Sequence, residues 1–273
     1  MKRSNWAKLI ALIVSLMILL VILLGWMLSR AIYTANKNMC ENRAKIVASS
    51  LKSYCNSNDY RLPPRYIENK QTGNRHSWRV LLFPFYGYDS VYGKYRFHEP
   101  WNSPQNQELA NCNNFACPAH STSPVMTNYV AVVGENTLWP APKKPAEYAL
   151  YDYESDEDDP GQYEWPVNRG RKIGPDCDSK IVLIELVQSD IPWMEPRDIT
   201  LDEFLDTIKK NPEGPFYNKY VKGIRAIDAS GNLRVIDPHE DRNKIREMFE
   251  VKPEKDAVHH DSTDPATAEG NGG

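Results

Sequence analysis

The sequence lacks any strong excess of charge of one sign, because 33 lysines and arginines are set against 36 aspartates and glutamates. The formal net charge is only −3. Proteins that bind nucleic acid or strongly charged membrane surfaces depend on a pronounced field of one sign. The composition therefore predicts no nucleic-acid partner.

The spacings of common catalytic sites are also missing, because the six histidines are scattered and form no Ser-His-Asp or Glu-x-x-His pattern. His98-Glu99 beside Trp101 could form an acid–base pair, but a histidine packed between aromatic rings is the commoner arrangement. Glu195-Pro196-Arg197-Asp198 favours an ion-paired turn over a catalytic site. We therefore expect no enzyme activity, no cofactor and no bound metal.

No charged residue interrupts the segment from Leu9 to Leu28. About 20 apolar residues at a rise of about 1.5 Å match a hydrocarbon core of about 30 Å. Residues 9–28 are thus expected to form a transmembrane helix in contact with the lipid bilayer. We take residues 1–30 as a cytoplasmic flank plus this anchor.

Lys2, Arg3 and Lys8 precede the apolar run, which predicts a cytoplasmic N-terminus and an extracytoplasmic main domain in a single-pass protein of the cell membrane. The alternative is a cleaved secretory signal, with Ser29-Arg30-Ala31 as a poor cleavage site. Signal peptides usually have an apolar region of about 7–15 residues, shorter than this one. Both interpretations export the remainder of the chain.

Proline is absent from residues 9–62, and Gly25 is the only glycine there. The sequence therefore favours one helix from about Leu9 to Cys55 over two helices broken near Ser29-Arg30, and Asn56 to Asp59 with Pro63-Pro64 would end it. A mostly apolar stripe recurs at helical spacing beyond the membrane and predicts that residues 31–57 pack on a soluble domain. The stripe consists of Ile32, Asn36, Met39, Cys40, Arg43, Ile46, Val47, Ser50, Leu51 and Tyr54.

Residues 31–252 are expected to form one exported α+β domain, with the helix on an antiparallel sheet and irregular insertions, mainly near 135–178. A capping box of Thr200 and Glu203 predicts a helix that extends to about Lys210. Strands are expected at 129–133 and, buried on both faces, at 180–187, with a hairpin from 222 to 237. Residues 253–273 are too polar to form a core and are expected to be a disordered tail.

Five cysteines lie in the part that we expect to be exported, where disulfides are permitted. Cys112 and Cys117, separated by four residues in a loop, form the best-placed pair; Cys40 and Cys55 would lie about 22 Å apart on one helix. Zinc held by Cys112, Cys117 and His120 is the alternative, although a fourth ligand is not evident.

The acidic run at 152–159 could bind calcium, but it lacks EF-hand spacing and suits a solvated insertion.

Several segments, taken in order, resemble a bacterial envelope family catalogued as domain of unknown function 1559. The main ones are His76 to Phe85, Phe115-Ala116-Cys117-Pro118, Thr127 to Gly134 and Ile191 to Asp198. The resemblance covers about residues 38–240. It implies a pilin- or pseudopilin-like fold with a large C-terminal elaboration, and a place in the cell envelope, but no reaction.

The chain departs from this family at both ends. Family members commonly begin with a prepilin-peptidase signal, but here the helix reads Lys8 to Val14 with no processing glycine and no early glutamate. The family's C-terminal His before Asp-Gly is also lost, since no histidine precedes Asp228 within twenty residues. We therefore expect an atypical member that keeps its anchor as a signal-anchor.

The function expected from the sequence is structural or associative, with other envelope proteins as partners. The alternative is an extracytoplasmic module that binds a small ligand or a metal in the aromatic loops around Tyr86 to Trp101. A hydrolase is the weakest of the three hypotheses.

Overall fold

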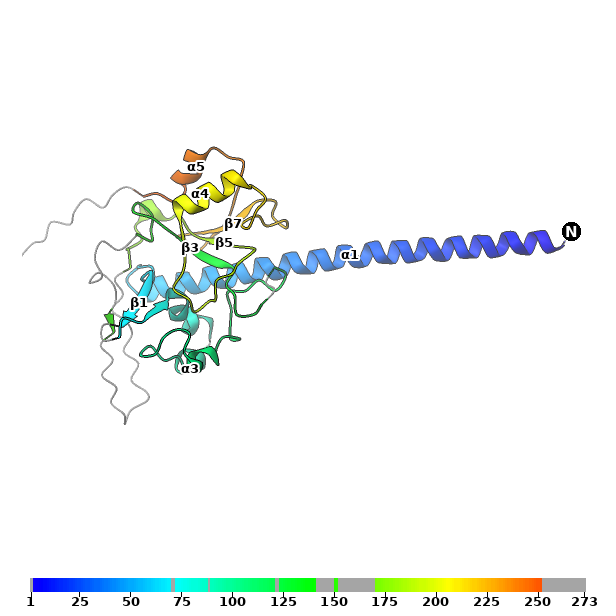
Figure 1. The fold of residues 1–273 in the computed structure, drawn as a ribbon. Helices are drawn as coiled ribbons and strands as arrows, with labels where there is room; N and C mark the ends of the chain where they lie inside the picture. The colour runs from blue at the N-terminus through cyan, green and yellow to red at the C-terminus, as the bar shows by residue number, and fades with distance from the viewer. Residues whose placement is uncertain are drawn as a thin grey trace, which may run out of the picture.

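A computed structural model of the chain describes residues 2–69, 72–87, 89–120, 123–140, 150–151 and 170–251. Its main feature is one unbroken helix, α1 (Lys2–Ser57), which projects far out of the folded domain (Figure 1). At about 1.5 Å per residue it is about 80 Å long. The prediction of a single helix is confirmed, because α1 continues through Ser29-Arg30 without a break.

α1 ends at Ser57, within the segment that the sequence predicted would end it. The Tyr60 amide donates to the Cys55 carbonyl at 2.8 Å, which closes the last turn. Asp59 and Tyr60 have left-handed backbone with φ of 53° and 59°, a conformation that commonly ends helices. Pro63 and Pro64 follow and carry no amide hydrogen with which to continue the helix.

A five-stranded sheet forms the centre of the domain, in the order β6-β3-β5-β7-β8. Its pairs are antiparallel except for β3 with β6, which is parallel. The predicted α+β class is thus confirmed. The strands are β3 (Tyr129–Val133), β5 (Ile181–Glu185), β6 (Ile199–Thr200), β7 (Ile224–Asp228) and β8 (Leu233–Ile236).

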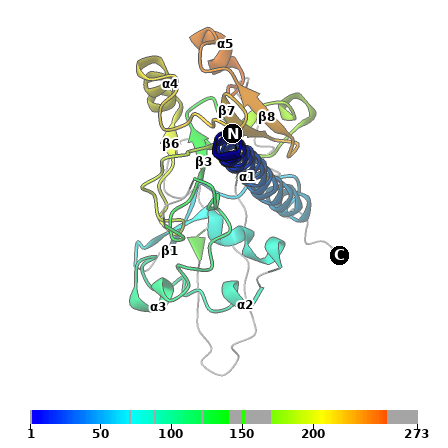
Figure 2. The ribbon, with the colours of Figure 1, turned by 90° about the vertical axis from the view of Figure 1, so that its right-hand side faces the viewer.

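The sheet is buried on both faces, as the apolar run at 180–187 predicted. In β3, Ala131 and Val133 belong to the core shared with α1, whereas Val130 and Val132 belong to a second core. Helices α4 (Leu201–Lys210) and α5 (Arg242–Glu247) cover that second core. Figure 2, viewed along α1, shows α4 and α5 on one side of the sheet. The predicted Thr200–Glu203 capping box opens α4.

The packing face of α1 is narrower than the predicted stripe. The buried positions from Cys40 onward recur at three and four residues and include Ala44, Val47, Leu51 and Tyr54. Three other members of the stripe are exposed and seven residues apart: Ile32, Met39 and Ile46. Because each residue advances 100° around a helix, Ile46 lies beside the face that contains Val47 rather than on it.

A smaller, loop-rich region packs on the α1 side of the sheet. It contains the sheet β2-β1-β4 and a 3-10 helix, Trp78–Tyr86, most of whose residues are buried. The remaining elements are β1 (Tyr66–Asn69), β2 (Arg75–Ser77), β4 (Leu150–Tyr151), α2 (Asp89–Tyr92), α3 (Pro104–Gln107) and a short 3-10 helix at Pro175–Cys177. Most of the expected insertion at 135–178, the acidic run at 152–159 and the tail at 253–273 lie outside the described residues.

Candidate functional site

A disulfide joins α1 to the loop before β3. Cys40 is bonded to Cys117, 77 residues later, with 5.3 Å between the Cα atoms. The expected Cys112–Cys117 pair is therefore wrong, and Cys112 is a free thiol. The side-chain oxygen of Asn128 accepts the Cys117 amide hydrogen at 2.7 Å and fixes this loop at the start of β3, against α1. Proximity along the chain did not decide the pairing.

Two further ligand-type side chains lie beside this disulfide. The Nδ1 atom of His120 is 3.8 Å from the Cys40 sulfur and 3.5 Å from Oε1 of Glu185. One ligand atom from each of these side chains and from Cys117 lies within 4.8 Å of the others. We call these four residues, Cys40, Cys117, His120 and Glu185, the Cys-His-Glu cluster.

The carboxylate of Glu185 is held from one side only. Its Oε2 atom accepts hydrogen bonds from Asn218 Nδ2 at 2.6 Å and from Arg225 Nε at 3.2 Å. Its Oε1 atom is buried, faces His120, and has no hydrogen-bond partner within the described part of the chain. The two donors thus orient the other carboxylate oxygen toward His120, into the cluster.

The Cys-His-Glu cluster lies where α1 enters the domain. Tyr220 stacks on the His120 ring with centroids 5.3 Å apart, and it also contacts the ring of Tyr33 of α1, with centroids 5.1 Å apart. Tyr33 is only five residues beyond the apolar segment. The spacing of Cys117 and His120 was visible in the sequence, whereas Cys40 and Glu185 reach the cluster only through the tertiary fold.

A second buried polar group ties the 3-10 helix to the sheet. Arg79 Nη2 lies 2.7 Å from Asp198 Oδ1, and both side chains are fully buried. The same carboxylate accepts from the Trp78 indole at 3.1 Å and from the Ala131 amide at 2.9 Å. Burial raises the pKa of Asp198, and Arg79 and these two donors oppose that increase. The set is closed on itself, which suits a structural role.

The ion-paired turn expected at Glu195 to Asp198 is present in part. Arg197 pairs with Glu195 at 2.9 Å and with Asp190 at 3.2 Å on the surface. Asp198 instead points inward to Arg79. The turn therefore contributes one side chain to the core.

His98 is less buried than a histidine packed between aromatic rings would be. Its side chain is about half exposed, 3.8 Å from Glu99. His76 has the packed environment instead: it is buried, lies 3.0 Å from the Tyr95 hydroxyl, and meets the rings of Tyr95 and Phe97 edge-on. Burial lowers the pKa of His76 to about 4. Tyr95 and Phe97, from the loop region proposed as a ligand site, thus pack on His76.

Comparison with known proteins identifies the family. The chain matches the family described as "Protein of unknown function (DUF1559)" over residues 34–171, about half its length. The chain belongs to this family. No curated protein and no solved structure matches it. The match includes the packing half of α1 and the loop with Cys117 and His120, which confirms the family that the sequence motifs indicated.

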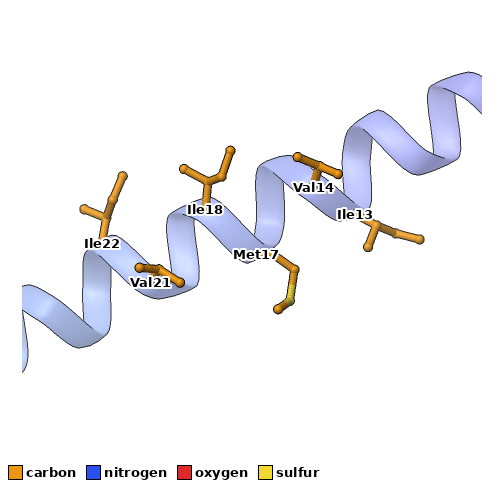
Figure 3. A pocket seen from close by; sticks show the side chains of 6 residues that line it. All are labelled: Ile13, Val14, Met17, Ile18, Val21 and Ile22. Carbon is orange, nitrogen blue, oxygen red and sulfur yellow. The ribbon is translucent and has the colours of Figure 1, made fainter.

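The DUF1559 protein has one described helix, α1, that is long and apolar enough to cross a membrane, and its most apolar stretch is not buried in the domain. Figure 3 shows six of its side chains, between Ile13 and Ile22, pointing outward around the helix. The shallow hollow between them is lined by this helix alone and by apolar groups only. Such a surface suits contact with lipid chains rather than a specific ligand.

Two hollows on the domain of the DUF1559 protein contain fewer metal-ligating side chains than the Cys-His-Glu cluster. One, of about 310 Å³, lies between Trp101 and Met194 near the aromatic loops. The other, of about 380 Å³, lies at the start of α4, where Arg246 is already paired with Asp202 and Glu250. The first hollow has no charged residue among the described residues that line it, and in the second the carboxylates of Asp202 and Glu250 are occupied by Arg246.

Proposed function

We propose that this DUF1559 protein is a single-pass protein of the cell envelope whose exported domain has a structural or partner-binding role and no catalytic one. In this proposal residues 9–28 cross the bilayer, the N-terminus is cytoplasmic, and the domain of residues 31–252 lies outside. The anchor is retained rather than cleaved.

One observation carries the proposal. α1 is a single helix whose first half is apolar and exposed, and whose second half packs on the domain and is joined to it by a disulfide. Exposing such a surface to water costs about 25 cal/mol per Å², which favours insertion into lipid. The Cys40–Cys117 disulfide supports an oxidising, extracytoplasmic location for the other half. The absence of a break in α1 supports a domain held close to the membrane.

An exposed strip on α1 supports the partner-binding role. Ile32, Met39 and Ile46 are 52%, 45% and 43% exposed and follow one another at seven-residue spacing. Side chains at this spacing align along one side of a helix. Contiguous exposed apolar side chains are typical of interaction surfaces. The strip runs from just beyond the apolar segment to the part of α1 that packs on the domain, where Ile46 lies beside buried Val47, and a neighbouring envelope protein could bind along this length.

The free thiols of Cys112 and Cys177 provide a test of anchoring and sidedness, because both are partly exposed. Cells that express the full chain are treated with a membrane-impermeant maleimide before lysis, and membranes are then extracted with alkaline carbonate. We expect labelling without permeabilisation and retention in the membrane pellet. The Cys112→Ser/Cys177→Ser variant controls for other sites. Labelling only after permeabilisation would contradict export, and release by carbonate would contradict the anchor.

Site-specific photo-crosslinking tests the role of the strip. A photoreactive phenylalanine analogue replaces Met39 in one variant and Lys45, an exposed residue on another side of α1, in a control variant. Irradiation of intact cells should yield discrete adducts from position 39 and none from position 45. Adducts from neither position, or the same adducts from both, would contradict a partner-binding strip.

A further inference from the structure

The Cys-His-Glu cluster contains the four side chains of a tetrahedral metal site, in a chain whose proposed function requires none. Two cysteines, a histidine and a carboxylate are ligand types that Zn²⁺ prefers. They come from α1, from the loop before β3 and from β5, so the fold and not the sequence assembles them. As observed, the two sulfurs are bonded to each other and cannot act as thiolate ligands.

The existing distances already fit part of a zinc coordination shell. With metal–ligand bonds of about 2.0–2.3 Å, the ligand atoms of a tetrahedron lie about 3.3–3.8 Å apart. The separation of Cys40 Sγ from His120 Nδ1 is 3.8 Å, and that of His120 Nδ1 from Glu185 Oε1 is 3.5 Å. The two bonded sulfurs must move apart to complete the shell, and the four ligand atoms already lie within 4.8 Å of one another.

The orientation of Glu185 is an independent indication of a missing ligand. A fully buried carboxylate normally has its oxygens hydrogen-bonded. Here Oε2 is bound by Asn218 and Arg225, while Oε1 points at the cluster without a hydrogen-bond partner in the described residues. Groups behind a metal-binding carboxylate commonly orient it in this way.

The charges of the cluster also suit a divalent cation. Two thiolates and the Glu185 carboxylate carry three negative charges when the disulfide is open. Zn²⁺ and the guanidinium of Arg225 together carry three positive charges, so the buried group is neutral overall. Without a cation, opening the disulfide would leave either uncompensated thiolates or protonated thiols beside Glu185.

We infer that the DUF1559 protein has two states at this cluster: a disulfide that joins α1 to the domain, and, after reduction, a Zn²⁺ site formed by Cys40, Cys117, His120 and Glu185. The reductant is a dithiol, which passes two electrons and two protons to the disulfide and itself becomes a disulfide. Zn²⁺ then displaces the two thiol protons. In both states α1 stays joined to the loop before β3, so the metal replaces the covalent link.

Cobalt provides the test, since Co²⁺ takes the place of Zn²⁺ and reports thiolate ligation through charge-transfer bands and tetrahedral geometry through intense d–d bands. The full chain in detergent micelles, in the Cys112→Ser/Cys177→Ser background, is titrated with Co²⁺ before and after reduction with a phosphine. We expect one Co²⁺ per reduced chain, displaced by Zn²⁺, and none per oxidised chain. No cobalt spectrum after reduction would overturn the inference.

Two substitutions separate a four-ligand site from binding by the cysteines alone. His120→Ala and Glu185→Gln should each weaken Co²⁺ binding at least tenfold, whereas His98→Ala, at an exposed histidine, should leave it unchanged. If either the His120→Ala or the Glu185→Gln variant bound Co²⁺ as tightly as the reduced chain without that substitution, the inference would be overturned.

Unfolding on reduction is monitored by far-ultraviolet circular dichroism. If the reduced chain loses structure, Zn²⁺ should restore it, and failure of Zn²⁺ to do so would also overturn the inference. Because these readouts do not depend on sidedness or on a partner, failure here would leave the proposed function intact.

Discussion

A disulfide between Cys40 and Cys117 joins α1 to the loop before β3: the two residues are 77 positions apart in the chain and 5.3 Å apart between their Cα atoms. The bond lies near the point where α1 enters the domain, beside the contact of Tyr33 with Tyr220. Further along, Ala44, Val47, Leu51 and Tyr54 hold α1 by apolar packing. Covalent and apolar contacts thus act on one face of the same helix.

Replacing Cys40 by serine should destabilise the domain by about 4.5 kcal/mol, because closing a loop of this length lowers the conformational entropy of the unfolded chain by that equivalent. Urea unfolding of the full chain in detergent, followed by tryptophan fluorescence with a chelator present, measures the change. A reductant should destabilise the wild-type chain by a similar amount and leave the variant unaffected. Equal stability of the two oxidised proteins would contradict a disulfide at Cys40.

Asp198→Asn should cost about 3–5 kcal/mol of folding free energy, because it leaves the buried Arg79 guanidinium without its counter-charge. Replacing both residues by Met and Leu should recover part of that loss. Asp206→Asn, at an exposed pair with Arg242, is the matched control and should not change the unfolding curve. If Asp198→Asn behaved like the control, the pair would not be buried as described.

Stability should fall as the pH drops from about 6.5 to about 4, in part because of His76. Its pKa is lowered to about 4 in the folded state by burial, so between these values the unfolded chain binds a proton that the folded chain does not. The resulting loss of folding free energy reaches about 3 kcal/mol at a pH of about 4. The His76→Gln variant should show a flatter pH dependence of the urea midpoint, and His98→Gln should retain the wild-type slope. The same slope in all three proteins would rule out this role for His76.

Cys55 should resist alkylation while the protein is folded. It belongs to α1 and is buried where this helix packs on the domain, and burial raises the pKa of its thiol to about 12, so almost no thiolate exists at neutral pH. Mass spectrometry after brief iodoacetamide treatment should find Cys112 and Cys177 modified and Cys55 unmodified. Pretreatment with denaturant should make all three react. Rapid modification of Cys55 in the native protein would contradict the packing of α1 on the domain.

How much of this could be predicted from the sequence depended on the range of the interactions. Local patterns gave α1, the capping box at Thr200 and the strand buried on both faces, because each element depends on neighbouring residues. The partner of Cys117 could not be found in this way, because it depends on where α1 lies against β3. For the same reason, the sequence did not single out His76 as the histidine buried among aromatic rings, and Glu185, in an apolar strand, gave no sign that its carboxylate faces His120.

The central claim is that α1 has one half in lipid and the other half outside the membrane on the domain, and a cysteine-accessibility scan tests it most directly. In the Cys112→Ser/Cys177→Ser background, single cysteines replace Ser4, Ile18 and Lys52 in turn, and intact cells receive a membrane-impermeant maleimide. We predict that position 52 reacts at once, position 4 only after permeabilisation, and position 18 only in the denatured chain. Reaction of position 18 in intact membranes, or of position 52 only after permeabilisation, would contradict the account.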